Sequence, residues 1–277
     1  MGTYNILHII KFTIREALAK KIILVFAGLA TLSLVILALL LFSTDAIDLV
    51  NSFNMKTRIE GQLVDVKVQL ATAIKAIFTV PLYGIGLFLS IFAVSGFIPS
   101  LLEKGNIDLF LSKPISRTDL ILGKFFGGSV VVFINILYMV LGIWVILGIT
   151  LNVWTVEFFL VVPIITFTFM VLYTLIILVG IITKSSILAM MLSYLFFFVL
   201  SPILEGRSGY SQFLSDTWNF VIEAFYYIIP QTTEMGKIAF ECAVGQSPES
   251  LLPLLYGSVI LILTLSASII IFNKKDY

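Results

Sequence analysis

The sequence has little charge and few of the side chains that catalytic and metal sites use. Charged residues make up 12% of its 277 residues and apolar residues 60%, whereas a soluble domain is about a quarter charged and half apolar. Cys242 is the single cysteine and His8 the single histidine. An intrachain disulfide and a Cys-x-x-Cys site are therefore excluded, and paired-histidine metal sites and Ser-His catalysis are unsupported.

The sequence also lacks a phosphate-binding loop. The Walker pattern requires Gly-Lys followed by Ser or Thr, but Gly123-Lys124 and Gly236-Lys237 each precede an apolar residue. With 17 basic and 16 acidic residues, the net charge gives no reason to expect a nucleic-acid partner. The chain is therefore predicted to have no catalytic residue, cofactor, metal or nucleotide site of its own, and we do not expect an enzyme.

What the sequence does contain is a set of long apolar runs. A run needs about 20 residues to cross the hydrocarbon core of a bilayer as a helix. Six runs have that length, at 22–42, 76–98, 125–149, 158–182, 187–204 and 253–272. Because backbone groups in lipid must be hydrogen-bonded within the segment, the runs are predicted to be helices. We expect an all-α, polytopic membrane protein with six transmembrane helices in a single transmembrane domain, residues 1–277.

Ionisable residues are missing from the middle of these runs. Proton pumps and many ion-coupled transporters place such groups at membrane depth, so a self-contained secondary transporter is disfavoured. The uncharged polar residues in the runs are interpreted mainly as interhelical hydrogen-bonding groups, with a substrate path as the alternative. They are Asn135, Tyr138, Thr166, Thr168, Tyr173, Thr174, Ser193 and Tyr194.

The basic residues indicate an orientation. With both termini inside, 11 of the 17 basic residues face the cytoplasm and the remaining six face outward. The positive-inside rule favours this arrangement, so we expect a multi-pass protein with both termini cytoplasmic.

Residues 4–20 form a basic amphipathic stretch ahead of the first run. His8, Lys11 and Arg15 share one face at helical spacing, and the opposite face is apolar. The apolar residues are Ile6, Ile10, Ile14 and Ala17. This pattern is typical of a helix that lies in the membrane interface. The alternative is that the first span simply continues into water.

Two long segments are expected on the outer side. In the first, 43–75, helical spacing of apolar residues predicts that the second span projects outward as an amphipathic helix. Those residues are Ile59, Leu63, Val66 and Leu70. In the second, 205–252, an aromatic-rich stretch that stops at Pro230 and a second short stretch over Glu234–Val244 indicate two short interfacial or re-entrant helices before the last span. Ser247-Pro248-Glu249 then predicts the N-terminal cap of the last helix.

The connection at 99–124 is expected on the cytoplasmic side and is the most informative loop. Pro114 ends any helix before it, and Ser116-x-x-Asp119 predicts the cap of the third helix. We interpret the loop as a short helix, a break, and a third helix that begins in the cytoplasm. Such a knob suits docking against a soluble partner, and an ordinary positively charged inner loop is the alternative.

Three short patterns in this loop belong together. They are Glu103-x-Gly105, then Leu109-x-Leu111-Ser112-Lys113-Pro114-Ile115-Ser116-Arg117, then Leu122-Gly123-Lys124. The set resembles the signature of ATP-binding-cassette (ABC) exporter permeases of the type-two membrane-domain family, with departures at Asn106 and Asp108. The order of the elements along the chain is also similar, as is Tyr227-Ile-Ile-Pro230 in the outer segment. Within the family, the chain is similar to permeases linked to multicopper-enzyme maturation.

The resemblance implies a permease subunit in the plasma (inner) membrane of a prokaryote. It would move an unidentified substrate, in the export direction, using ATP hydrolysed by a separate cytoplasmic ATPase subunit. A second copy of itself or a related permease would complete the membrane part. A membrane scaffold or assembly factor without a transport cycle is the alternative.

The resemblance also implies which residues communicate with the ATPase. Those of the loop and the start of the third helix are Glu103, Gly105, Lys113, Pro114, Ser116, Arg117, Gly123 and Lys124. On the interfacial helix, His8, Lys11 and Arg15 would lie beside the ATPase.

Overall fold

The structure is a computed structural model, and it describes residues 2–19, 21–43, 56–59, 62–102, 116–213 and 215–275. Helices account for nearly all of these residues, and six of them, alone or as consecutive segments, are long and apolar enough to cross a membrane. The expected all-α polytopic class is therefore confirmed. A short β-hairpin is the departure from it.

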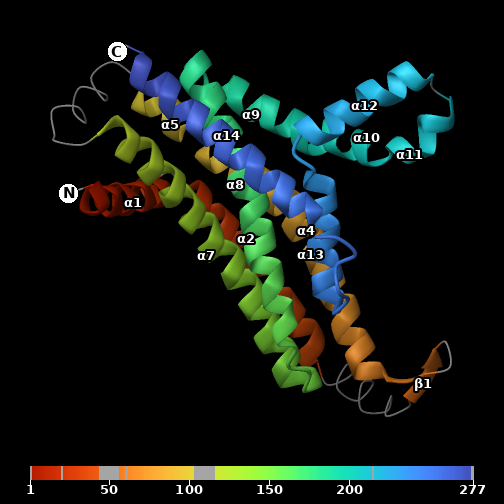
Figure 1. The fold of residues 1–277 in the computed structure, drawn as a ribbon. Helices are drawn as coiled ribbons and strands as arrows, with labels where there is room; N and C mark the ends of the chain where they lie inside the picture. Colours follow the sequence, from red (N-terminus) through yellow and green to blue (C-terminus); the bar gives the residue numbers. More distant parts are fainter. Residues whose placement is uncertain are drawn as a thin grey trace.

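The first half of the chain supplies three of the six spans (Figure 1). Its elements are α1 (Gly2–Ala19), α2 (Ile22–Phe42), β1 (Lys56–Ile59), β2 (Gln62–Asp65), α4 (Val66–Val94), α5 (Phe97–Leu101) and α7 (Arg117–Leu151). The spans are α2, the α4–α5 segment and α7.

The second half supplies the other three spans and a helical segment between the last two. Its first elements are a 3-10 turn (Val156–Leu160), α8 (Val161–Thr183), α9 (Ser186–Tyr194), a π-helical turn (Leu195–Leu200) and α10 (Ser201–Glu205). The remaining elements are α11 (Arg207–Tyr210), a 3-10 turn (Ser211–Phe213), α12 (Asp216–Ile228), α13 (Thr232–Val244) and α14 (Leu252–Lys274).

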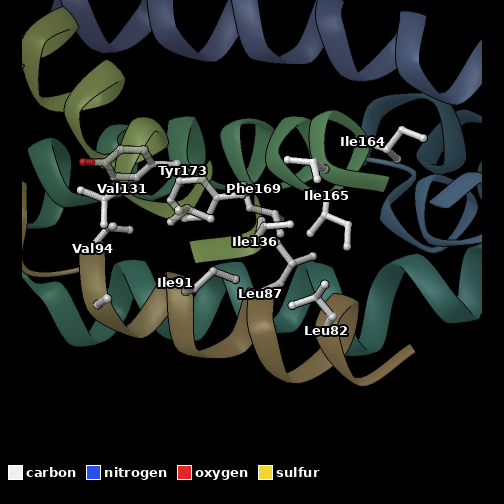
Figure 2. Packing of buried hydrophobic residues seen from close by; sticks show 14 of the residues in the cluster. Leu82, Leu87, Ile91, Val94, Val131, Ile136, Ile164, Ile165, Phe169 and Tyr173 are labelled. Carbon is white, nitrogen blue, oxygen red and sulfur yellow. The ribbon is translucent and has the colours of Figure 1, made fainter. Parts of the chain in front are cut away.

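The apolar core lies between α4, α7 and α8 (Figure 2). Leu87 and Ile91 of α4 pack there against Ile136 of α7 and Phe169 of α8, and all four side chains are buried. In its most apolar stretch 72% of the α8 residues are buried, against 11% in α14. α8 is therefore the central span, and α14 packs on its outside.

Lys21 separates α1 from the first span. Its φ of 56° is left-handed, which no residue inside a right-handed helix adopts. Consequently α1 and α2 are distinct helices rather than one that continues out of the membrane. Figure 1 shows α1 turned away from the direction of the spans.

Two helix starts differ from the sequence prediction. Ile59 and Leu63 lie in the antiparallel hairpin and not on an amphipathic helix. α4 begins only at Val66, where the Asp65 carboxylate accepts from the Lys67 backbone N–H at 2.9 Å. The hairpin satisfies its backbone groups by cross-strand bonds, which apolar spacing at four positions does not reveal.

The last helix begins later than predicted. α14 starts at Leu252, and the Ser250 hydroxyl accepts from the Leu252 N–H at 3.2 Å. Pro253 lies in its first turn, which suits a residue that has no N–H. The predicted cap at residues 247–249 is wrong, because Pro253 offers the same N-terminal signal closer to the apolar run.

The polar residues within the spans divide into two groups. Tyr138 bonds Thr31 of α2 at 2.9 Å, Thr174 bonds Thr264 of α14 at 2.7 Å, and Tyr194 donates to a carbonyl of α4 at 2.9 Å. These three join helices, as interpreted from the sequence. Others bond their own helix: Asn135 and Ser193 each donate to the carbonyl four residues earlier. Thr168 does so too, and its hydroxyl also contacts the Met235 sulfur of α13 at 3.6 Å.

Candidate functional site

The candidate site lies at the end of the bundle where both termini are found (Figure 1). Four parts of the chain meet there: α1, the start of α7, and the C-terminal ends of α8 and α14. We call this region the terminal end. Among the predicted residues of the loop, Ser116, Arg117, Gly123 and Lys124 are at this end. The others, Glu103, Gly105, Lys113 and Pro114, lie outside the described residues.

Ser116 caps α7 as its sequence context predicts. Its backbone is extended, and its hydroxyl accepts from the Asp119 N–H at 3.0 Å. Such a cap satisfies one of the N–H groups that a helix start leaves without a partner. The cap sets the start of α7 at Arg117. From there this span is one continuous helix to Leu151.

Arg117 holds the C-terminal end of the last span. Its guanidinium donates to the carbonyl oxygens of Phe272 at 3.2 Å and Lys275 at 2.5 Å. The Asn273 amide also donates to the Thr118 hydroxyl at 3.3 Å. A helix C-terminus leaves carbonyls unsatisfied and carries partial negative charge, so a cation there stabilises it. These bonds tie the start of α7 to the end of α14.

Lys275 extends this connection to the central span. Its ammonium donates to the carbonyl oxygens of Ile181 at 2.8 Å and Ile182 at 3.4 Å. Both carbonyls belong to the last turn of α8, which ends at Thr183. One short stretch at the end of the chain thus joins three spans.

Gly123 and Gly127 allow α1 to pack closely against α7. A Cβ atom added at Gly123 would lie 2.5 Å from the Cβ of Ile9, and one at Gly127 would lie 2.6 Å from the Cβ of Thr13. Real Cβ atoms do not approach so closely, so a larger residue would force the helices apart. Small residues spaced by four are a common way to bring membrane helices into contact.

Lys124 lies between these two glycines, and its side chain is buried. The side chain is 2% exposed and forms an ion pair with Glu16 of α1. Its ammonium is also 5.2 Å from the ring centre of Phe12 and 5.5 Å from that of Phe97. The Lys124 carbonyl accepts from the hydroxyl of Tyr173, in α8, at 3.2 Å. Lys124 therefore connects α1, the third span and the central span.

The predicted basic face of α1 is exposed. His8, Lys11 and Arg15 all lie on the side turned away from α7. The face of α1 that packs against α7 differs from the predicted apolar face, because Ile9 and Thr13 pack over Gly123 and Gly127. The fully packed residues are Ile9, Thr13 and Ala17, whereas Ile6, Ile10 and Ile14 are half-buried.

The sequence interpretation missed Glu16, Tyr173 and the chain's last turn. Two signals were present. Glu16 is the only acidic residue among the first 20, beside four basic side chains, and Gly123-x-x-x-Gly127 is a small-residue spacing at the start of a span. Neither identifies the partner, since Glu16 and Lys124 are 108 positions apart.

A second polar cluster lies in the segment before the last span. The guanidinium of Arg207 is 3.4 Å from the ring centre of Tyr226, whose hydroxyl donates to Glu234 at 2.8 Å. Burial, and then the hydrogen bond to Glu234, raise the pKa of Tyr226 to about 12. Glu205 and Lys237 form an ion pair beside it, and this bond raises the pKa of Lys237. We call this set the α10–α13 cluster.

Both regions consist of hydrogen bonds, ion pairs and ring contacts between helices. Within the described ranges, no group of three or more His, Cys, Asp or Glu side chains is placed to hold a metal ion. The terminal end instead joins helices by capping bonds, close packing and a buried ion pair. Its arrangement suits the transmission of movement between helices.

The comparison with protein families gives the class of this protein. Residues 7–277 match the family described as ABC-2 family transporter protein. The chain therefore belongs to that family, as the loop pattern implied, and is a multi-pass permease subunit of an ABC transporter. The family is thus one of transport subunits. No curated protein matches the chain.

Proposed function

We propose that this chain is the membrane permease of an ATP-driven exporter, with both termini and the terminal end in the cytoplasm. A separate cytoplasmic ATPase would bind there and supply the energy. The observation that carries the proposal is the junction itself. Lys124, Arg117 and Lys275 connect α1, α7, α8 and α14 at one end of the bundle, so a force applied there reaches several spans.

α7 would carry the movement across the membrane. It runs without a break from Arg117 to Leu151, and Leu120, Ile121 and Ile143 along it are buried in the core. The predicted loop, whose residues 103–115 lie outside the described residues, leads in sequence to the Ser116 cap of α7. Displacement of that loop by the ATPase would therefore tilt or shift a continuous helix rather than bend a flexible connection.

The exposed basic face of α1 would contact the ATPase. His8, Lys11 and Arg15 stand on one side of a helix whose other side is held against α7. Several cations on a rigid surface favour a partner with acidic groups and speed its association. The proposed contact therefore pairs α1 with an acidic patch on the ATPase.

A second copy of the chain, or a related permease, would complete the membrane part. The spans α2, α9 and α14 have few buried residues in their most apolar stretches, at 22%, 28% and 11%. Their remaining apolar surface is available both to lipid and to a partner subunit. The proposed assembly is two permeases with two ATPases in a prokaryotic plasma membrane.

Co-purification tests the proposal directly. The chain would be expressed with a separate ABC ATPase subunit, starting with any that is encoded in an adjacent reading frame, and the complex reconstituted into vesicles. We expect a stable complex and stimulated ATP hydrolysis, with Lys11→Glu plus Arg15→Glu weakening the association at least tenfold. The matched control is Lys237→Glu, an exposed cation in the α10–α13 cluster, which should leave association unchanged.

Two results would contradict the proposal. An ATPase that binds but is never stimulated would favour a scaffold without a transport cycle. Labelling of Lys113→Cys from outside intact cells would place the loop on the wrong side of the membrane. Arg117 is not used as a contact variant, because its side chain holds α14 and its loss would also disturb the fold.

A further inference from the structure

We infer that Glu16 is a positioning residue that, through Lys124, makes α1 and α7 a single moving unit during the transport cycle. The inference rests on the proposed function, since it concerns how force from the ATPase is delivered. Glu16 lies on α1, outside the loop and the basic face that the sequence pattern assigns to the ATPase. It would act without touching ATPase or substrate.

The ion pair between Glu16 and Lys124 is largely removed from water. Glu16 is 19% exposed and Lys124 is 2% exposed. Taking two charges out of water costs free energy that an apolar pair of similar size would not cost, so a buried ion pair is weak evidence for stability. It does specify geometry, because either charge loses a favourable partner if the helices slide. We infer that the role of this pair is to fix the register of α1 against α7.

The glycine contacts on both sides of Lys124 set the same register. Ile9 fits over Gly123 and Thr13 fits over Gly127. A slide of α1 by one helical turn, about 5.4 Å, would move both side chains off the glycines and separate Glu16 from Lys124. Packing and charge therefore resist the same displacement.

α1 is attached to its own neighbour in sequence much less firmly. The chain between α1 and α2 passes through the left-handed Lys21, and α2 itself is loosely packed, with 22% of its most apolar stretch buried. A backbone break of this kind can absorb a change of angle. When the ATPase pushes on the exposed face of α1, α1 and α7 should move together. The backbone at Lys21 should then absorb the difference in movement between α1 and α2.

A disulfide between α1 and α7 tests whether they move together. The variant is Thr13→Cys with Gly127→Cys, in a chain whose only native cysteine is replaced by Cys242→Ala. A disulfide spans Cβ atoms about 3.8 Å apart, so the 2.6 Å separation at this pair requires the helices to part by only about 1 Å. Peptide mapping would establish that the bond has formed.

The measurement is ATPase stimulation by the full complex in vesicles, before and after oxidation. We expect the oxidised permease to keep stimulation within twofold of its reduced form, because the bond joins parts that already move as one. A loss of more than tenfold on oxidation, restored by reduction, would show that α1 must move relative to α7. That result would overturn the inference.

Charge variants provide a second test that does not depend on the disulfide. Glu16→Gln should leave ATPase co-purification unchanged while reducing stimulation about tenfold, and the exchange Glu16→Lys with Lys124→Glu should restore most of it. If Glu16→Gln abolishes co-purification and the exchange does not recover it, Glu16 contacts the ATPase directly and the inference is wrong.

The proposed function and the inference fail in different ways. A wild-type chain that neither binds nor stimulates the ATPase contradicts the proposed function. Stimulation by the wild type, together with a cycle blocked by the disulfide, contradicts only the inference.

Discussion

The molecule contains two Lys–Glu ion pairs among its described residues, and they lie in very different surroundings. Lys124 and Glu16, at the terminal end, are 2% and 19% exposed. Lys237 and Glu205, in the α10–α13 cluster, are 56% and 30% exposed. Both pairs join residues that are distant in the sequence. Burial and the packing around each pair are what differ.

This difference separates a pair that specifies geometry from one that does not. Water screens the exposed pair and lets either side chain move, so such pairs contribute roughly 0–1 kcal/mol. The buried pair has glycine contacts on both sides and two aromatic rings near the ammonium. Identical chemical groups therefore position a helix at one end of the protein and contribute little at the other.

The largest expected effect is from Lys124→Met. Removing one partner of a buried ion pair typically costs about 3–5 kcal/mol, because the other charge stays buried. We expect a loss near the lower limit, about 3 kcal/mol, since Glu16 keeps some exposure to water. Thermal unfolding of the detergent-solubilised protein measures it. Lys237→Met is the matched control, and equal losses in the two variants would remove the distinction between the pairs.

Gly127→Val should have the next largest effect, by crowding the α1–α7 contact. Its Cβ would lie 2.6 Å from that of Thr13, and overpacking of this kind costs about 1–3 kcal/mol. The control is Gly84→Val in α4, because a Cβ at Gly84 meets no atom of the described residues within 4 Å. Thermal unfolding of both variants decides the matter, and comparable stability for the two would mean that α1 is not held by close packing.

Tyr226→Phe tests the α10–α13 cluster through its hydrogen bond to Glu234 and not through its ion pair. Losing the bond to Glu234 should cost about 1 kcal/mol by the same unfolding measurement. The pKa of Tyr226 is raised to about 12, from an unfolded value of about 10. Its contribution to stability is therefore complete below about pH 10 and declines as the pH rises through the folded value.

Alkaline titration of tyrosine absorbance checks this assignment. The difference between wild type and Tyr226→Phe should show one phenol that ionises well above the exposed tyrosines. A difference curve centred near pH 10 would mean that the Tyr226 hydroxyl is in contact with water.

Lys237→Ala should have the smallest effect, within about 0.5 kcal/mol of the wild type at moderate salt. Its partner Glu205 is 30% exposed and can be solvated without it. The pKa of Lys237 is already above its usual value, so no change is expected near neutral pH. A loss of 2 kcal/mol or more would show that the α10–α13 cluster is held as rigidly as the terminal end, which would contradict the comparison.

Part of the candidate site could be predicted from the sequence because its determinants are local. The Ser116 cap depends on residues only three positions apart, and the structure confirms it. The role of Arg117 illustrates the opposite case. Its guanidinium bonds the carbonyl of Lys275, 158 positions away, and a motif in the loop carries no information about the end of the chain. The loop pattern assigned Arg117 to the ATPase, a role that stays a prediction.

The sequence by itself determined the six spans and the all-α class, because the bilayer requires about 20 apolar residues per crossing and internal hydrogen bonding of the backbone. It also determined the family, through a local pattern in one loop. Only the tertiary structure decided which side of α1 packs, which carboxylate meets Lys124 and what Arg117 holds. Those contacts join residues more than 100 positions apart. The glycines on α7 let α1 approach closely enough for Glu16 to meet Lys124, and Arg117 finds its partners because the C-terminal end of α14 packs beside the start of α7.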